Sequence, residues 1–463
     1  MEKESRYPSS SSTNDVLSSH LGPETEPFHW TDSNTPTRRN SSRSAESRQN
    51  GVNESTATGL GQEAQLSAKT RLRPKYDLEP ESASHCSMIN PYDKKRPKLL
   101  IRQRLHHFTW AWYTMPMSTG GLSLLIRNQL KTFDSLETIG FIFYFFNLAL
   151  FTAISITMLL RFWIHKGDFV RSITHPREGF FVPTFFLSFA TIITSTERYW
   201  IPNDDGVLSW AIQGTFWAYV FLSLIIAVGQ YSYIFTVHSF GLQTMMPTWI
   251  LPIFPIMLSG TIASVIAKTQ PEISILPVLG AGLTCQGLGL SVAMLMYAHM
   301  IGRLMQSGLP NREHRTGLFM CVGPPSFTAL ALIGMAKSLE RSPVAKEGIL
   351  LDMVVLYNIA IISAVFLWAL SFWWFGIAVI AVAQAPPKHF HLGWWACVFP
   401  NTGFTLATIS MAKEFGNEVL IWMTTAMSII MVCTYFLVLI CQVHAVLVQD
   451  IMYPGRDEDV EDH

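Results

Sequence analysis

Ten long apolar segments, separated by short polar stretches, occupy the chain between residues 108 and 449. Most reach the length that a helix needs to cross the hydrocarbon core of a bilayer, roughly 20 residues. Inside a bilayer the backbone must satisfy its own hydrogen bonds, and segments this long and apolar do so as helices. We therefore predict an all-α polytopic membrane protein with ten transmembrane helices. They cover residues 108–126, 138–160, 180–196, 207–237, 248–267, 276–302, 316–336, 349–385, 392–412 and 418–449. The eighth segment is overlong, but no cluster of turn residues divides it, which predicts one long, tilted helix.

The polar parts of the chain divide it into further regions. Of the 463 residues, 49% are hydrophobic and 14% are charged. Residues 1–92 hold hardly any apolar run, which predicts a disordered cytosolic tail that serves phosphorylation or turnover, or is an inert extension. Residues 93–107 form a basic juxtamembrane segment, residues 108–449 the ten-helix domain, and residues 450–463 an acidic cytosolic tail.

The distribution of basic residues predicts the orientation in the membrane. Ten spans place both tails on the same side, and the loops on that side carry more Lys and Arg than the opposite loops. Basic loops stay in the cytosol, so we expect both termini there. The basic residues of 93–107 fit this rule, and they would also be attracted to anionic lipid on the inner leaflet.

Proline alternates along the ten segments. Every odd segment holds an interior proline, followed by small or hydroxyl residues, whereas even segments lack one except for Pro277 at the very start of the sixth. This repeat predicts five hairpins of one kinked and one straight helix, with the kinked helices in an inner ring around a central pore and the straight ones facing lipid. Small residues also help helices to pack closely. The predicted kinks are at Pro116, Pro183, Pro255, Pro324 and Pro400.

The ninth segment carries the most specific pattern. Phe399 precedes Pro400, and Asn401, Thr402 and Gly403 follow it. Proline frees carbonyl groups that, at membrane depth, belong against protein or a water-filled passage. We interpret this segment as a pore helix in which Phe399 is a bulky plug.

Charged residues are scarce within the ten segments. Asp352 and Glu418 are the ones present, and each lies close to the start of its segment. An acid-lined cation pathway or a buried carboxylate that carries a coupling proton is therefore not predicted. Three lysines end odd segments on the outer side: Lys268, Lys337 and Lys413. They either give the outer mouth of the pore a positive charge that attracts anions, or they are ordinary interfacial lysines.

The sequence lacks the motifs of several enzyme classes. It contains no Walker motif and no G-x-S-x-G, so neither an ATP-driven pump nor a serine hydrolase is predicted. His106 and His107 show no metal-ligand spacing. We expect no enzyme activity, no cofactor, no metal ion and no nucleic-acid partner.

Several motifs, in order over about residues 105–459, resemble the tellurite-resistance/dicarboxylate transporter family, which includes fungal malic acid transport proteins, plant slow anion channels and fungal sulfite efflux pumps. The motifs are His107-Phe108-Thr109-Trp110-Ala111-Trp112 with Thr119-Gly120-Gly121, the stretch from Pro247 to Pro255, Gln286-Gly287-Leu288-Gly289, Gly323-Pro324-Pro325-Ser326-Phe327, Phe399-Pro400-Asn401-Thr402-Gly403-Phe404 and the stretch from Tyr453 to Asp459.

The resemblance implies ten helices around a central pore, both termini inside, and a homotrimer with one pore per subunit. It places the gate at Phe399, with Phe327 as a second ring. The candidates for lining the pore and binding substrate are Thr119, Ser259, Thr261, Ser326, Thr328, Asn401 and Thr402.

We therefore expect a plasma-membrane transporter of C4-dicarboxylates, malate first, with succinate, fumarate or malonate as further substrates. The proton would be carried by the singly protonated substrate. The main alternative is a sulfite efflux pump or another small-anion channel on the same scaffold. A membrane receptor that signals through the tail is a further alternative, and it predicts no flux after reconstitution.

Overall fold

Five helical hairpins follow one another along the chain, and each begins with a 3-10 helix. The computed structural model describes residues 98–201, 206–238, 241–342 and 352–454, so the predicted tail at residues 1–92 and most of the acidic tail lie outside the described residues. The 3-10 helices are η1 (Trp110–Tyr113), η2 (Glu178–Phe181), η4 (Pro247–Ile253), η5 (Arg312–Val322) and η6 (Leu392–Cys397).

Each 3-10 helix leads into an inner α-helix, and an outer α-helix follows. The inner helices are α2 (Thr114–Arg127), α5 (Pro183–Trp200), α7 (Phe254–Ile266), α9 (Gly323–Leu339) and α12 (Phe399–Phe415). The outer helices are α3 (Leu136–Ile164), α6 (Gly206–Val237), α8 (Glu272–Ser307), α11 (Met353–Gln384) and α13 (Glu418–Val448).

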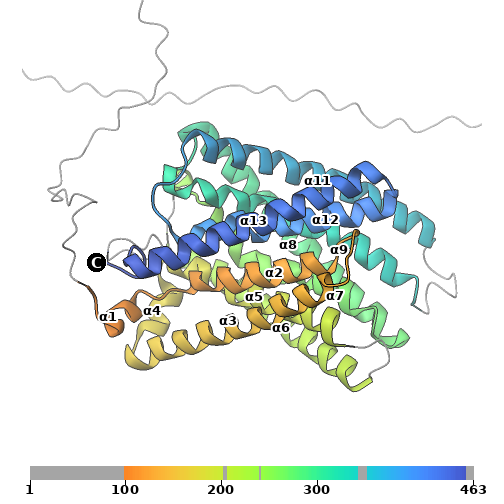
Figure 1. Ribbon diagram of the computed structural model, residues 1–463, viewed down its shortest axis with the longest axis horizontal. Coiled ribbons are helices and arrows are strands. Elements are labelled where there is room, and N and C mark those ends of the chain that lie inside the picture. The colour runs from red at the N-terminus through yellow and green to blue at the C-terminus, as the bar shows by residue number, and fades with distance from the viewer. Residues whose placement is uncertain (1–97, 202–205, 239–240, 343–351, 455–463) are drawn as a thin grey trace, which may run out of the picture. The chain divides into compact units, whose positions relative to one another are not determined.

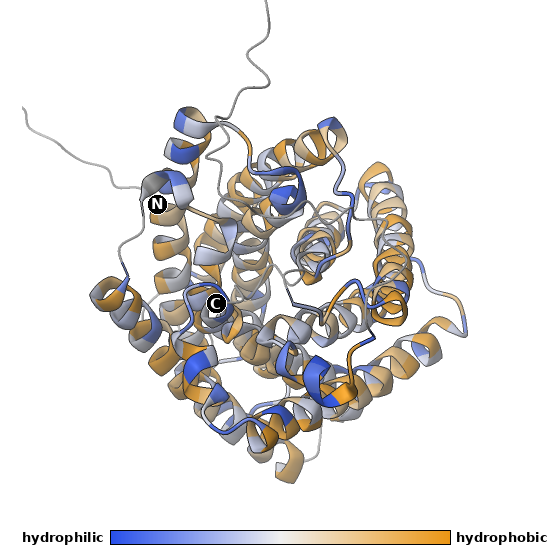
Figure 2. Cartoon of the chain, turned by 90° about the vertical axis from the view of Figure 1, so that its left-hand side faces the viewer, coloured by the Kyte–Doolittle hydropathy of each residue, from blue (hydrophilic) through white to orange (hydrophobic). Residues whose placement is uncertain are grey.

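The five inner helices form a closed ring. α2 packs on α5, α5 on α7, α7 on α9, α9 on α12, and α12 returns to α2. The outer helices cover this ring, and Figure 2, which looks along the helices, shows hydrophobic residues over the perimeter. Of the most apolar 18-residue stretch of α11 only 11% is buried, whereas 89% of the corresponding stretch is buried in the span that contains α7. The outer faces are thus the ones that lipid would cover.

Eight of the helices among the described residues are long and apolar enough to cross a membrane. Ten spans were expected; η1 with α2, and η6 with α12, are not among the eight. Both belong to the inner ring, and their buried residues include many threonines, serines and glycines. A helix that is enclosed by protein does not need an apolar surface, because its neighbours replace the lipid.

The prolines lie where each 3-10 helix gives way to an α-helix. Pro183 is the first residue of α5, Pro255, Pro324 and Pro400 are the second residues of α7, α9 and α12, and Pro116 is the third of α2. The first turn of an α-helix has N–H groups without partners, so proline sacrifices no hydrogen bond there. We expected bends within continuous helices; instead, each inner span changes from 3-10 to α at its proline.

Two outer helices refine the expected pattern further. α8 begins at Glu272, so Pro277 lies inside it, and the rule that outer helices lack an interior proline is wrong at this position. The eighth segment is a single helix, α11, as expected, and the Asp352 carboxylate caps it by accepting hydrogen bonds from the N–H groups of Val354 and Val355.

The ends of the described chain meet on one side of the bundle. α1 (Ile101–His106), within the basic segment 93–107, lies near the C-terminal end of α13 at the left of Figure 1. Arg104 donates a hydrogen bond to the carbonyl of Val446 at 3.0 Å, and the Leu99 N–H donates to Gln449 Oε1 at 3.3 Å. The five 3-10 helices that begin the hairpins lie toward this same side of the bundle, because each inner helix that follows them runs toward the opposite side.

Candidate functional site

Three cavities follow one another along the inner helices and the segments that lead into them. We call them the vestibule, the near cavity and the far cavity. The vestibule lies among the segments that lead into the inner helices, and the near cavity shares Met320 and Gly393 with it. The far cavity lies deeper along the inner helices, and Phe399 lines both the near and the far cavity. Phe399 therefore stands between two cavities on one path.

The near and far cavities are narrow and uncharged. Each leaves about 20 Å³ for the centre of a water molecule, which is room for roughly one water; the vestibule leaves about 370 Å³ on the same measure. Among the described residues that line the two narrow cavities, none is charged. The near cavity is lined by Thr114, Thr184, Leu251, Met320 and Ala396, among others, and the far cavity by Leu124, Thr194, Thr261, Phe327 and Thr402, among others.

Stacked aromatic rings separate the near cavity from the far cavity. The rings of Phe399 and Phe327 stack with their centroids 5.0 Å apart and their planes at 27°. Phe254 meets Phe327 edge-on at 6.5 Å. Phe399 and Phe327 are 2% and 5% exposed. The rings fill the space between the near and the far cavity.

Each of these rings lies against a glycine of the next inner helix. A Cβ atom at Gly403 would lie 2.6 Å from the Phe327 ring, and one at Gly323 would lie 2.5 Å from the Phe254 ring. A Cβ at Gly121 would lie 3.3 Å from the Phe399 ring. The glycines of α9, α12 and α2 thus make space for the rings of α7, α9 and α12.

Of the seven polar residues proposed for the pore, Thr261 and Thr402 line the far cavity. Three others engage outer helices instead. Thr119 shares a 2.9 Å hydrogen bond with Tyr435 of α13. Ser326 donates to Ser371 of α11 at 3.1 Å, and Gln286 of α8 donates to Thr328 at 2.7 Å. These three hydroxyls do not line either narrow cavity.

The remaining two residues are buried beside the path. Asn401 donates from Nδ2 to the Cys397 carbonyl at 2.8 Å. Its Oδ1 atom and the Ser259 hydroxyl have no hydrogen-bond partner within the described part of the chain. Neither residue lines the near or far cavity.

Several lining residues were missed by the sequence reasoning. Thr184, Thr191 and Thr194 of α5 line the near or far cavity together with Leu187. Their spacing of three and four residues is that of one face of a helix. This spacing could have identified these threonines from the sequence. Ser188 of the same helix instead donates to the Tyr113 carbonyl of the neighbouring span.

Each inner helix ends in a cation on the side opposite the vestibule. The five are Arg127, Arg198, Lys268, Lys337 and Lys413. Lys268 follows α7 directly, and burial lowers its pKa to about 8, helped by Arg198, Lys413, Lys337 and Arg341. Cations act on one another in this way only when they lie close together. The three lysines predicted for this mouth thus belong to a larger cationic group.

Some of these cations are balanced by acids. Arg127 pairs with Glu137 of α3 at 3.1 Å, and Lys337 pairs with Glu414. Cations near a helix C-terminus also stabilise the helix dipole. Stabilisation of the helix dipole explains why a single helix ends in a cation. It does not explain why cations from different helices lie close enough to lower the pKa of Lys268.

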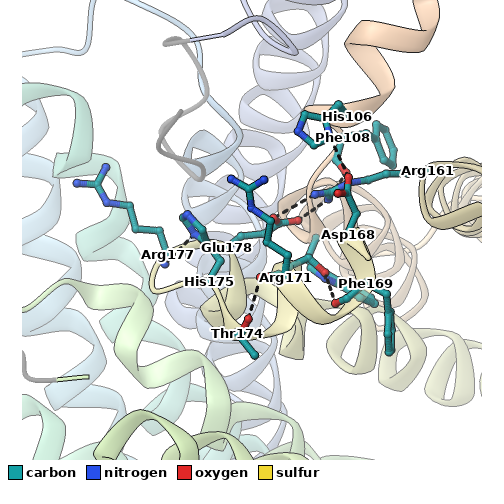
Figure 3. Close-up of polar contacts among 12 residues, drawn as sticks. His106, Phe108, Arg161, Asp168, Phe169, Arg171, Thr174, His175, Arg177 and Glu178 are labelled. Atoms are coloured by element: carbon teal, nitrogen blue, oxygen red, sulfur yellow. Dashed lines mark hydrogen bonds and ion pairs between the residues drawn. The ribbon is translucent and has the colours of Figure 1, made fainter. Parts of the chain in front are cut away.

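More charged residues lie in the helices than the sequence segments suggested. α3 continues to Ile164 and includes Arg161, and α5 continues to Trp200 and includes Glu197. Arg161 is 4% exposed and forms an ion pair with Glu178 at 2.5 Å; it also lies 3.5 Å from Asp168 (Figure 3). Glu197 is 5% exposed and accepts a hydrogen bond from Thr269. The expectation that Asp352 and Glu418 were the only charges in the spans is wrong.

One cluster of possible metal ligands lies beside this ion pair. The ligand atoms of His106, His165 and Asp168 lie within 4.8 Å of one another. His106 Nδ1 and Asp168 Oδ2 are 2.8 Å apart and share a hydrogen bond that holds α1 against α4 (Asp168–Thr174). The sequence showed His106 without its partners, because Asp168 lies 62 residues away along the chain.

A bundle of membrane-length helices around a path of cavities is the architecture of a channel or transporter. The comparison with known families makes this specific. Residues 107–443 match the family model SLAC1, described as voltage-dependent anion channel. The chain belongs to this family of integral membrane proteins.

Two kinds of curated relatives are similar to the chain. The malic acid transport protein of Schizosaccharomyces pombe is 34% identical over 374 residues, which is 80% of this chain and 85% of the relative. A putative malic acid transport protein of the same organism is 29% identical, covering 79% and 86%. The sulfite efflux pump SSU1 of Arthroderma benhamiae is 24% identical, covering 72% and 89%. The names describe anion transport.

Proposed function

We propose that the protein transports C4-dicarboxylate anions, with malate as the preferred substrate and succinate or fumarate as further ones, and also the three-carbon dicarboxylate malonate. The observation that carries this proposal is the uncharged lining of the two narrow cavities inside the inner helices, together with the cations at the far ends of those helices. Hydroxyl and N–H dipoles replace part of an anion's hydration without trapping it, and the cations raise the local anion concentration. The similarity to the malic acid transport protein supports malate as the substrate.

Phe399 is proposed as the gate, with Phe327 as the second ring. The two rings stack at 5.0 Å between the near and far cavities. An anion passes when the Phe399 side chain swings away from Phe327. Thr261 and Thr402 are the hydroxyls of the predicted set that we propose to meet the anion beyond the gate.

The protein is proposed to lie in the plasma membrane as a homotrimer, with both termini in the cytosol. The contact of Leu99 with Gln449 supports one side for both termini, and the basic residues of α1 support the cytosolic side. The vestibule would then face the cytosol.

Proton coupling is proposed to come from the substrate, which would cross as the singly protonated acid. The uncharged lining of the two narrow cavities supports this. Uptake should then follow the pKa of each substrate when acids of different pKa are compared. A pH profile that stays in place across those acids would point to a titrating side chain, and buried Glu197 would be the first to test.

The second candidate function is sulfite efflux, which the similarity to SSU1 pumps supports. Expression in a host that lacks both activities separates the two. We expect radiolabelled malate to accumulate and sulfite tolerance to stay at the level of the empty host. Sulfite tolerance without malate uptake would overturn the proposal.

A further inference from the structure

The vestibule contains polar groups from three separate hairpins. Arg177 precedes η2, His314 lies in η5 and His391 precedes η6, and all three line this cavity. We propose that the vestibule holds a binding site for dicarboxylate anions, in which Arg177 pairs with one carboxylate and the rings of His314 and His391 meet the other. The inference rests on the proposed function, and it places a substrate site on the side where the chain ends meet.

The backbone at Arg177 is held in place by its neighbour in the chain. Glu178 is 2% exposed and accepts hydrogen bonds from both terminal nitrogens of Arg161, at 2.5 and 3.3 Å. Figure 3 shows Arg177 extending away from this ion pair, on the opposite side of the backbone. A buried, bidentate pair holds the start of η2 in one position. The Arg161–Glu178 pair therefore acts as a positioning element that keeps Arg177 at the vestibule.

The two histidines lie close together in the lining of the vestibule. Their ring centroids are 6.4 Å apart, and Arg177 is near enough to His314 to interact with it electrostatically. Burial lowers the pKa of His391 to about 4, with a smaller contribution from His314. His391 is thus neutral near pH 7, and its ring hydrogen-bonds to the Glu313 backbone, while Arg177 supplies the positive charge.

The acid in this region, Glu313, lies close enough to His314 and His391 to interact with both, and backbone N–H groups engage it. Glu313 accepts hydrogen bonds from the backbone N–H groups of Lys388 at 3.1 Å and His389 at 3.4 Å. Backbone donors stabilise a carboxylate and spread its charge. The repulsion that Glu313 would exert on an incoming anion is reduced accordingly.

The vestibule is large enough for a ligand with two charged ends. It leaves about 370 Å³ for the centre of a water molecule, and it narrows at Met320 and Gly393 into a cavity that leaves about 20 Å³. An anion is therefore held in front of the narrow path until the path opens. The planar guanidinium of Arg177 matches one carboxylate with two parallel hydrogen bonds, which leaves the other carboxylate free to meet the histidines.

Calorimetric titration of the purified full-length chain in detergent tests the site. L-malate and butyrate, acids of four carbons with two and one carboxyl groups, are the probes. Arg177→Gln is expected to raise the Kd for malate by about tenfold or more, the loss of a charge-assisted hydrogen bond, and to lower the preference for malate over butyrate. The matched control is Arg171→Gln, an exposed arginine of α4 (Figure 3), which should change Kd less than twofold.

His391→Gln, which keeps an N–H donor, provides a second test. If Arg177→Gln does not fold, Arg177→Lys provides a third. His391→Gln should raise the malate Kd less than Arg177→Gln does, and Arg177→Lys should give an intermediate Kd. An unchanged Kd in Arg177→Gln, or in Arg177→Lys where only that variant folds, overturns the site. Malate flux through wild-type proteoliposomes is measured in parallel: flux with an unchanged Kd overturns the site alone, whereas wild-type protein without malate flux overturns the proposed function.

Discussion

Replacing Phe399 by alanine tests the gate, and the structure supplies a matched control on the same helix. Phe399 is 2% exposed and stacks on Phe327 at 5.0 Å. Phe404 is 3% exposed and stacks on Trp368 of the outer helix α11 at 5.5 Å. Both rings are buried in α12, so either truncation should lower stability by a similar amount, about 3–5 kcal/mol. Only Phe399 lies between the near and far cavities.

The expected change in flux follows from the contact that the gate must break. Stacking of two aromatic rings contributes about 0.5–1.5 kcal/mol beyond the burial of their area. If opening breaks this contact, its removal lowers the barrier by the same amount, which is a rise in flux of roughly twofold to tenfold. The ring also fills the narrowest part of the path, so this range is a lower bound.

The assay is uptake of radiolabelled malate into proteoliposomes that contain equal amounts of folded protein, judged by gel filtration. Phe399→Ala should raise the initial rate, and Phe404→Ala should leave it near the wild-type rate or below. Equal rates in the two variants would mean that loss of packing, not loss of a gate, controls flux. A lower rate in a well-folded Phe399→Ala variant would refute the reasoning.

Three further predictions concern the lining, the cationic mouth and the buried ion pair. Thr261→Val should lower malate flux, because its hydroxyl lines the far cavity, while Thr119→Val should not, because that hydroxyl bonds to Tyr435; equal losses in transport assays would argue against the assigned lining. Lys268 has a pKa lowered to about 8, so it loses its positive charge as the pH rises through 8, and influx of anions from that side should fall between pH 7 and 9; Lys268→Gln should remove this fall, and an unaltered pH profile would contradict the assignment. Arg161→Met leaves buried Glu178 without its partner and should destabilise the protein by about 3–5 kcal/mol, and a thermal melting temperature equal to that of wild type would disprove this role.

The hairpin order could be predicted because it depends on features that are local in sequence. Apolar length marks each outer helix, and proline marks the start of each inner helix, since its missing N–H is tolerated best in the first turn. Even so, Pro400 was expected to bend a continuous helix. The change from a 3-10 to an α-helix at that residue depends on packing against the ring, which no single segment reveals.

The direction of side chains within the inner helices could not be predicted. Every residue of α2 from Thr114 to Ser123 is buried, so the helix has no exposed face from which the opposite face could be inferred. Thr119 and Thr261 both follow a proline, yet one meets Tyr435 and the other the far cavity. Hydropathy periodicity works only when a helix has a solvent or lipid side.

Charges at the helix ends were missed for a related reason. The apolar segments were ended before Arg161 and Glu197, because a charged residue normally marks the membrane boundary. Arg161 can be buried because Glu178 neutralises its charge. This partner lies 17 residues further along the chain, in a different helix. Only the tertiary structure brings such partners together.

Thiol accessibility at Thr402 tests most directly whether anions travel along the path between the cavities. Thr402 is fully buried and lines the far cavity beside Phe399. In a Thr402→Cys variant, a charged methanethiosulfonate reagent should block malate flux, and saturating malate should slow the block, whereas the same reagent should leave a Thr119→Cys variant as active as its parent. Modification of the introduced thiol, verified by mass spectrometry, without loss of flux would show that the anion takes another route.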